Sequence, residues 1–166
     1  DKERAELTKA LLMNTADIFY DEQGEPYFVR RQGAGLMDLA GALTTEVVVV
    51  ESDSKNAKVE LGSIKDKNFS FELDFYNFSD KVKYYSVEHL FMKDTIGNAG
   101  EGLDFSLLKS TDLVTAMNGE RYVKVDPNSR DNPARYTFSF DFSRDSIAWN
   151  QFVEGFLMFN PLSLNE

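Results

Sequence analysis

The chain has 166 residues, of which 42% are hydrophobic and 13% aromatic, and its 28 acidic and 18 basic side chains give a net charge of −10. This apolar content can offset the entropy of ordering the chain, so a folded core is expected and disorder is excluded. No apolar run approaches the roughly 20 residues of a membrane-spanning helix. The acidic balance argues against nucleic acid as a partner, because phosphate backbones require clustered lysine and arginine.

The chain lacks cysteine, which excludes disulfides, thiol catalysis and thiolate metal sites. A single histidine, His89, excludes any site that requires two imidazoles. Both counts are compatible with the cytosol and with an exported bacterial surface protein.

Helical patterns occupy residues 1–43. Apolar residues recur at helical spacing from Leu7 to Ile18, and the polar sequence at residues 21–24 interrupts them. A second short helix is predicted by residues at i, i+3, i+4 and i+7, which are Leu36, Leu39, Ala40 and Leu43. Neither helix is long enough to be stable alone in water, so each apolar stripe requires a surface to pack on.

Residues 44–166 have the β-branched and aromatic composition of strands and contain 12 of the 14 phenylalanines. Apolar and polar residues alternate at 69–76 and 135–142, as in half-buried strands. Further strands are predicted at 47–50, 82–91, 113–117, 121–125 and 152–159. Short strands separated by turns, with no helical pattern between them, predict an antiparallel β-sandwich rather than a parallel sheet.

The same pattern predicts details of strand pairing and of the core. Asn118-Gly119 between two strands predicts a two-residue hairpin. The segment Phe152–Phe159 is apolar on both faces and is expected to be a central strand. Five phenylalanines are predicted to lie in the core, which are Phe71, Phe75, Phe138, Phe140 and Phe156.

Several groups have the composition of functional sites but fit structural roles better. Gly33-Ala34-Gly35 is similar to the start of a dinucleotide-binding loop, but Asp38 occupies the place of the third glycine, so a tight turn before a helix is favoured. His89 has no Gly-x-Ser-x-Gly partner motif, which favours a histidine on one sheet face. Asn68 and Asn77 begin glycosylation sequons beside phenylalanines that should be buried.

Oxygen ligands that calcium could use gather in one loop, at Asp94, Asn98, Glu101 and Asp104. Their spacing does not match the helix–loop–helix calcium site, so a solvated acidic loop is favoured. Asp141 and Asp145 could perform acid–base chemistry, but nothing distinguishes them from the other acids. The aromatic residues that could stack on a sugar, but that more commonly fill a core, are Tyr84, Tyr85 and Trp149.

Two segments, Leu7–Ala16 and Arg31–Ala40, together resemble the end of a subtilisin-like serine protease domain. The shared features are a late helix ending in Thr-Ala, a variable loop, and a Gln-Gly-Ala-Gly turn into the closing helix. The strands that follow resemble the fibronectin type III-like domain beside the protease in lactocepin-type cell-envelope proteinases, at Val59–Gly62, Phe69–Asn77 and Phe152–Phe156. The resemblance covers nearly the whole chain.

This resemblance implies that residues 1–43 are the two-helix tail of a protease domain and that residues 44–166 form a fibronectin type III-like sandwich. In that family the catalytic Asp, His and Ser precede the helix matching Leu7–Ala16, and the Gly-Thr-Ser motif is absent here. We therefore expect no catalytic, cofactor-binding or metal-binding residue in this chain. For the parent protein, the resemblance implies serine endopeptidase activity, an extracellular, wall-attached bacterial location, and calcium bound elsewhere.

Two functions remain open. The first is a non-catalytic accessory fragment of an exported subtilisin-like endopeptidase, which supports its own catalytic domain and shapes access of a protein or peptide substrate. Its expected contacts are the loops Lys93–Asp104 and Pro127–Pro133, because loops at the end of a sandwich commonly bind partners. The second is a free-standing sandwich that binds a carbohydrate or a surface partner.

The apolar stripes of residues 1–43 also predict where the two helices pack. The stripe at Leu36–Leu43 lies close to the first strand and is expected to pack on its own sandwich. The stripe at Leu7–Ile18 is separated from it by a loop and is expected to pair with a second copy, which gives a homodimer.

Overall fold

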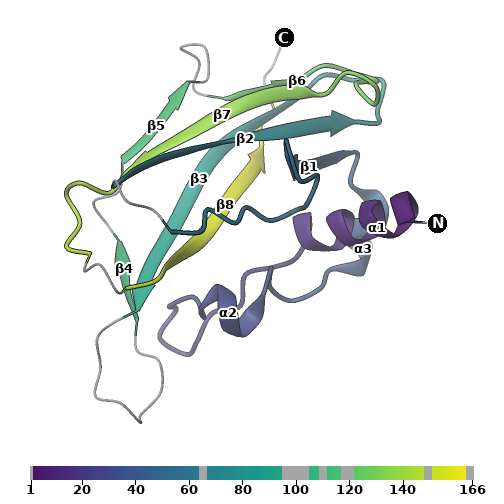
Figure 1. The fold of residues 1–166 in the computed structure, drawn as a ribbon. Helices are drawn as coiled ribbons and strands as arrows, with labels where there is room; N and C mark the ends of the chain where they lie inside the picture. Colours follow the sequence, from purple (N-terminus) through teal and green to yellow (C-terminus); the bar gives the residue numbers. More distant parts are fainter. Residues whose placement is uncertain are drawn as a thin grey trace.

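The computed structural model describes residues 2–63, 67–94, 105–108, 112–116, 122–147 and 151–163. Three helices come first in this part of the chain, which are α1 (Lys2–Asn14), α2 (Val29–Gln32) and α3 (Leu39–Thr44). The strands that follow are β1 (Val47–Glu51), β2 (Asn68–Asn77), β3 (Lys83–Asp94), β4 (Phe105–Leu108), β5 (Asp112–Ala116), β6 (Val123–Val125), β7 (Ala134–Asp141) and β8 (Val153–Pro161). They form two antiparallel sheets, seen as layers in Figure 1, so the predicted mainly β antiparallel class is confirmed.

The first sheet has the strand order β1-β2-β7-β5. Phe71 of β2 lies opposite Phe138 of β7, and Phe75 lies opposite Val49 of β1. Because side chains alternate across a strand, this register places the phenylalanines of β2 and β7 on one inward face. Phe75, Phe138 and Phe140 are fully buried, which confirms these three core predictions, and Phe71 is partly buried and packs against them.

The second sheet is built around β3. Tyr85 of β3 pairs with both Val123 and Pro161, and Lys93 pairs with both Ser106 and Val153. Strand β8 therefore lies along one edge of β3, and β6 and β4 lie at the two ends of the other edge. The inner face of this sheet packs on the phenylalanines of the first sheet through Tyr85, Val87, Phe91, Leu157 and Phe159.

Three sequence predictions about these strands are wrong. Asn118-Gly119 lies outside the described residues, but the strands that flank it do not pair as a hairpin: β5 pairs with β7 in the first sheet and β6 pairs with β3 in the second. Strand β8 pairs only with β3 among the described strands, so it is an edge strand and not a central one. Phe156 lies on the outer face of β8, because Leu157 and Phe159 of that strand face the core.

Helix α1 packs on the outer face of β1, as Figure 1 shows. Ala10 is buried against Val48 and Val50, whose side chains point away from the sandwich core. The carboxamide of Asn14 donates to the Val49 carbonyl at 3.0 Å and accepts from the Val49 amide at 2.7 Å. The first apolar stripe thus has a partner within its own chain, and the helix ends at Asn14, before Ile18.

Helix α3 begins later than the second apolar stripe. The Asp38 carboxylate accepts a hydrogen bond from the Gly41 amide and caps the helix, so Leu36 lies outside it. Ala42 is the buried residue of α3, whereas Leu36, Leu39 and Leu43 are 64%, 58% and 78% exposed. The expectation that Leu36, Leu39 and Leu43 pack on the sandwich is wrong. The cap at Asp38 starts the helix in an orientation in which Ala42 faces inward and the leucines face solvent.

Candidate functional site

Among the residues that the structure describes, the exposed large apolar side chains are concentrated in the first 43 residues. Those of the helical segment, which we call the helical apolar residues, are Leu7, Phe19, Tyr20, Leu36, Met37, Leu39 and Leu43. Leu39 and Leu43 share one face of α3, since residues four apart on a helix are neighbours. Exposed apolar groups gathered on one segment are typical of a surface that contacts another protein domain.

An isolated antiparallel β-bridge joins the residue Asp17, which follows α1, to Leu36, which precedes α3. The amide of Asp17 donates to the Leu36 carbonyl at 2.8 Å, and the amide of Leu36 donates to the Asp17 carbonyl at 2.7 Å. Gly35 makes the close approach feasible, because its φ of +124° favours glycine and a Cβ there would overlap the Asp17 carbonyl. The Gln32 carboxamide oxygen also accepts from the Phe19 amide at 2.7 Å, so the loop is tied to α2.

Arg30 anchors the segment to the second sheet. Its Nε donates to Glu154 Oε1 at 3.2 Å, and its Nη2 lies 3.9 Å from the carboxylate of Asp94. The guanidinium also lies over the rings of Phe28 and Phe152, at 5.6 and 5.1 Å from their centroids. Since α1 packs on β1 and Arg30 reaches β8, the helical segment is fixed to both sheets of the sandwich.

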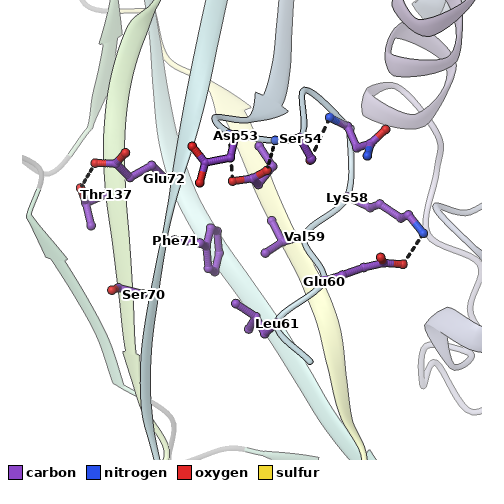
Figure 2. Close-up of a pocket in the computed structure, with 12 residues that line it drawn as sticks. Asp53, Ser54, Lys58, Val59, Glu60, Leu61, Ser70, Phe71, Glu72 and Thr137 are labelled. Carbon is purple, nitrogen blue, oxygen red and sulfur yellow. Dashed lines mark hydrogen bonds and ion pairs between the residues drawn. The ribbon is translucent and has the colours of Figure 1, made fainter. Parts of the chain in front are cut away.

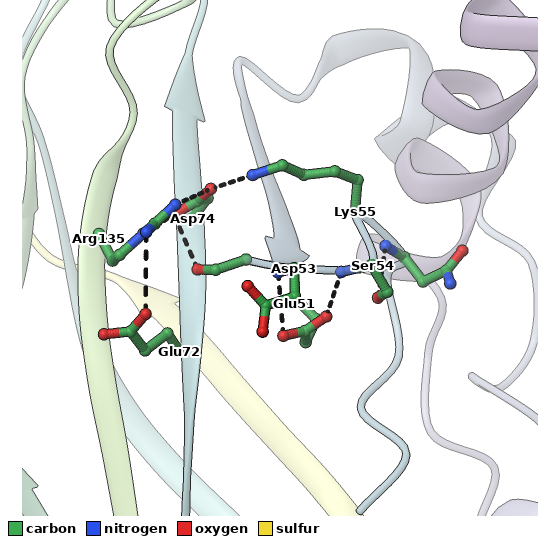
Figure 3. A network of polar contacts seen from close by, with 9 residues as sticks. Glu51, Asp53, Ser54, Lys55, Glu72, Asp74 and Arg135 are labelled. Carbon is green, nitrogen blue, oxygen red and sulfur yellow. Dashed lines mark hydrogen bonds and ion pairs between the residues drawn. The ribbon is translucent and has the colours of Figure 1, made fainter.

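A buried carboxylate organises the outer face of the first sheet (Figure 3). Asp74 is fully buried and accepts from Ser52 Oγ at 2.9 Å, Lys55 Nζ at 2.6 Å and Arg135 Nε at 2.7 Å. Burial raises the pKa of Asp74, but the hydrogen bonds from Arg135, Lys55 and Ser52 outweigh burial and lower the pKa to about 2. Asp74 is therefore ionised in the folded protein and holds the 52–55 turn against β2 and β7.

The first group of sequence candidates has structural roles. Gly33 and Gly35 form the turn that leads to the Asp17–Leu36 bridge, and Asp38 caps α3, so the dinucleotide-like pattern is a turn as predicted. His89 lies on the inner face of β3, with its ring 5.6 Å from those of Phe91 and Phe140. Its surroundings are aromatic, in agreement with a histidine on one sheet face.

Of the loop considered for calcium, only Asp94 lies within the described residues; Asn98, Glu101 and Asp104 lie outside them. Asp94 Oδ1 accepts from the Phe152 amide at 2.8 Å and so joins β3 to the start of β8. Asp141 accepts from the Ser143 amide at 2.7 Å, which lowers the pKa of that carboxyl. In the described part of the chain, no group of three or more His, Asp or Glu side chains is placed to hold a metal ion.

The remaining candidates are separated by the fold. Asn77 is fully buried, and its carboxamide donates to Lys81 O and accepts from Ser79, so it cannot carry a glycan in the folded protein. Tyr84 and Tyr85 are successive residues of β3 and lie on opposite faces, so they do not form one stacking platform. Asn68 is exposed on β2, and Trp149 lies outside the described residues.

Of the two loops expected to make contacts, the structure describes only Pro127–Pro133 in full. Most of Lys93–Asp104 lies outside the described residues. The turn at Pro127–Pro133 is held by buried Ser129, whose Oγ accepts from the Asn77 amide at 2.9 Å, and it exposes Arg130, Asp131 and Asn132. None of the described helices is long and apolar enough to cross a membrane.

Sequence reasoning did not identify Asn14, Arg30 or Asp74 as important residues. A signal existed only for Asp74, a charged residue in the middle of an apolar strand. The roles of Asn14 and Arg30 depend on contacts with Val49 and Glu154, which are 35 and 124 positions away in the chain.

The comparisons place the chain next to bacterial peptidases. No family model matches it. Over 161 residues, or 95% of this chain, it is 29% identical to a peptidase found in several strains of one bacterium. These relatives are C5a peptidases of Streptococcus pyogenes, among them those of serotypes M18 and M1, and the chain spans 13% of their length. The chain is therefore similar to one segment of a much longer peptidase, which supports the protease part of the resemblance.

Proposed function

We propose that this chain is a non-catalytic accessory segment of an exported subtilisin-like serine endopeptidase of a bacterial cell envelope. In this proposal residues 1–43 complete the catalytic domain, and residues 44–166 form the fibronectin type III-like sandwich that supports it and shapes access of a protein substrate. The single observation that carries the proposal is the exposure of the helical apolar residues on a segment that is otherwise firmly held.

One side of this segment is attached to the sandwich and the other side is exposed to solvent. Ala10, Asn14 and Arg30 attach it to the sandwich, whereas Leu36, Leu39 and Leu43 face solvent. Apolar surface loses about 25 cal/mol of stabilisation for each Å² left in water, so a covering domain is favoured. The similarity to a segment of streptococcal peptidases supports a catalytic domain as that cover.

The proposal is tested in the full-length protein encoded around this chain. Replacing Leu39 and Leu43 with serine should reduce the yield of mature peptidase and lower its melting temperature, because the two domains lose their apolar contact. The matched control replaces Leu61 and Phe78, which are exposed outside the helical segment, with serine. Equal effects from both pairs, or no effect from either, would contradict the proposed docking.

The chain alone should have no peptidase activity. The Gly-Thr-Ser motif is absent, and the single histidine, His89, lies against Phe91 and Phe140 on the inner face of β3. Incubation with casein and with a fluorophosphonate probe measures this directly, and labelling of any serine in the folded chain would overturn the proposal.

A further inference from the structure

The edge of β2 that faces β1 is only half covered. Strand β1 pairs with β2 from Asn77 back to Leu73, after which the chain turns away at Ser52. On the opposite edge, β7 pairs with β2 from Phe75 through Asn68. Residues 68–72 of β2 therefore have one paired edge and one open edge, and an open edge is a template for another strand.

The hydrogen bonds at the two ends identify which backbone groups face the opening. The Ser52 amide donates to the Glu72 carbonyl at 2.9 Å, and the Phe142 amide donates to the Lys67 carbonyl at 2.9 Å. Backbone groups of an antiparallel strand alternate between its two edges, so even-numbered residues face the β1 side. The amide and carbonyl of Ser70 and the amide of Glu72 thus point into the opening, with no partner in the described part of the chain.

A groove of about 890 Å³ lies beside this edge (Figure 2). Residues 56–61 form its far wall and run past β2 without pairing to it. Phe71, Val59 and Leu61 project into the space between the two walls. The groove therefore combines unpaired backbone groups with an apolar floor, which are the two features that bind an extended peptide.

The charges around the groove define the chemistry of its occupant. The lining carries the carboxylates of Glu51, Asp53, Glu60 and Glu72 and one ammonium, that of Lys58, which is paired with Glu60. The Asp53 carboxylate has no ion-pair partner among the residues that the structure describes. An approaching cationic side chain would meet a net negative rim, whereas an anionic one would be repelled.

We propose that residues 68–72 of β2 bind an extended basic peptide segment from another protein, which adds as a strand between β2 and residues 56–61. Its backbone would pair with Ser70 and Glu72, alternate apolar side chains would contact Phe71 and Val59, and the intervening lysine or arginine side chains would face Asp53 and Glu60. This inference does not depend on the accessory role, because it rests on the sandwich alone.

The experiment uses the folded chain and the probe peptide acetyl-(Lys-Val)₃-amide. We expect saturable binding in isothermal titration calorimetry, and we expect the Ser70 and Glu72 amide resonances to shift and their hydrogen exchange to slow by about tenfold on binding. A peptide with alternate N-methylated amides should not bind, since it cannot pair with a strand edge. Equal binding of the N-methylated peptide, or resonance shifts confined to other residues, would overturn the proposal.

Three variants separate the backbone and charge contributions. Ser70→Pro removes an amide that β7 does not use, so it should abolish binding and keep the sheet, which circular dichroism verifies. The double variant Asp53→Asn with Glu60→Gln should weaken binding by about tenfold and does not alter the backbone. The matched control is Glu88→Gln, an exposed acid on the outer face of β3, which should bind normally. If the double variant and the control bind equally well, the charge argument is wrong.

Discussion

At the scale of single residues, Asp74 makes stability dependent on pH. Its pKa is lowered from 3.8 to about 2 in the folded protein, so the ionised form contributes about 2 kcal/mol above pH 4. This contribution disappears as the pH falls from about 4 to about 2, because the folded carboxylate then takes up its proton. Lys55 and Arg135 would at that point lose their shared anion.

Urea unfolding at pH 7 and at pH 2 measures this contribution. At pH 7, Asp74→Asn should lower the free energy of unfolding by about 2 kcal/mol, whereas at pH 2 the difference from the unchanged protein should become small. Asp126→Asn is the control, since Asp126 is exposed and forms only a surface ion pair with Lys124. A difference that is the same at both pH values would contradict the assignment.

Gly35 is the second position where one residue decides local structure. Gly35→Ala places a Cβ against the Asp17 carbonyl, so it should break the Asp17–Leu36 bridge. Gly24→Ala is the matched control, because Gly24 also has a positive φ but has free space around it. We expect Gly24→Ala to cost about 1–2 kcal/mol from backbone strain alone, and Gly35→Ala to cost clearly more in thermal melting. Equal costs would show that the bridge relaxes around the added methyl group.

At the scale of elements, inward and outward side chains alternate along β7 and β8. Similar substitutions on the two faces should therefore lower the free energy of unfolding by different amounts. Phe140 of β7 lies in the core between the sheets, so Phe140→Ala should cost about 3–5 kcal/mol through the cavity that it leaves. Phe156→Ala on the outer face of β8 should cost clearly less. Chemical unfolding of both variants tests this order, and a larger loss for Phe156→Ala would mean that the face of β8 is assigned wrongly.

At the scale of the whole molecule, the exposed helical segment predicts self-association of the isolated chain. Leu36, Leu39 and Leu43 have no cover in the described structure, and two copies can cover each other. Sedimentation across a hundredfold dilution should show reversible dimers, and replacing Leu39 and Leu43 with serine should abolish them. The pairing expected through Leu7–Ile18 stays a prediction, although β1 already covers Ala10. A monomer at every concentration would contradict both modes.

The sequence alone determined the fold class and much of the core. Period-two alternation in β2 and β7 encodes which side chains face inward, because the pleat places successive residues on opposite faces. The helical spacing before residue 43 likewise predicted helices, and the Gly33–Gly35 turn was read correctly. No comparable local signal marks the residues that connect helix and sandwich.

The tertiary structure decided the rest, because those features depend on pairings between distant segments. Asn118-Gly119 has the local chemistry of a hairpin, yet the strands that flank it join different sheets, β5 beside β7 and β6 beside β3. The exposure of Leu36, Leu39 and Leu43 follows from the cap at Asp38 and the docking of α1 on β1. The open edge of β2 exists because β1 turns away at Ser52, where buried Asp74 holds the turn.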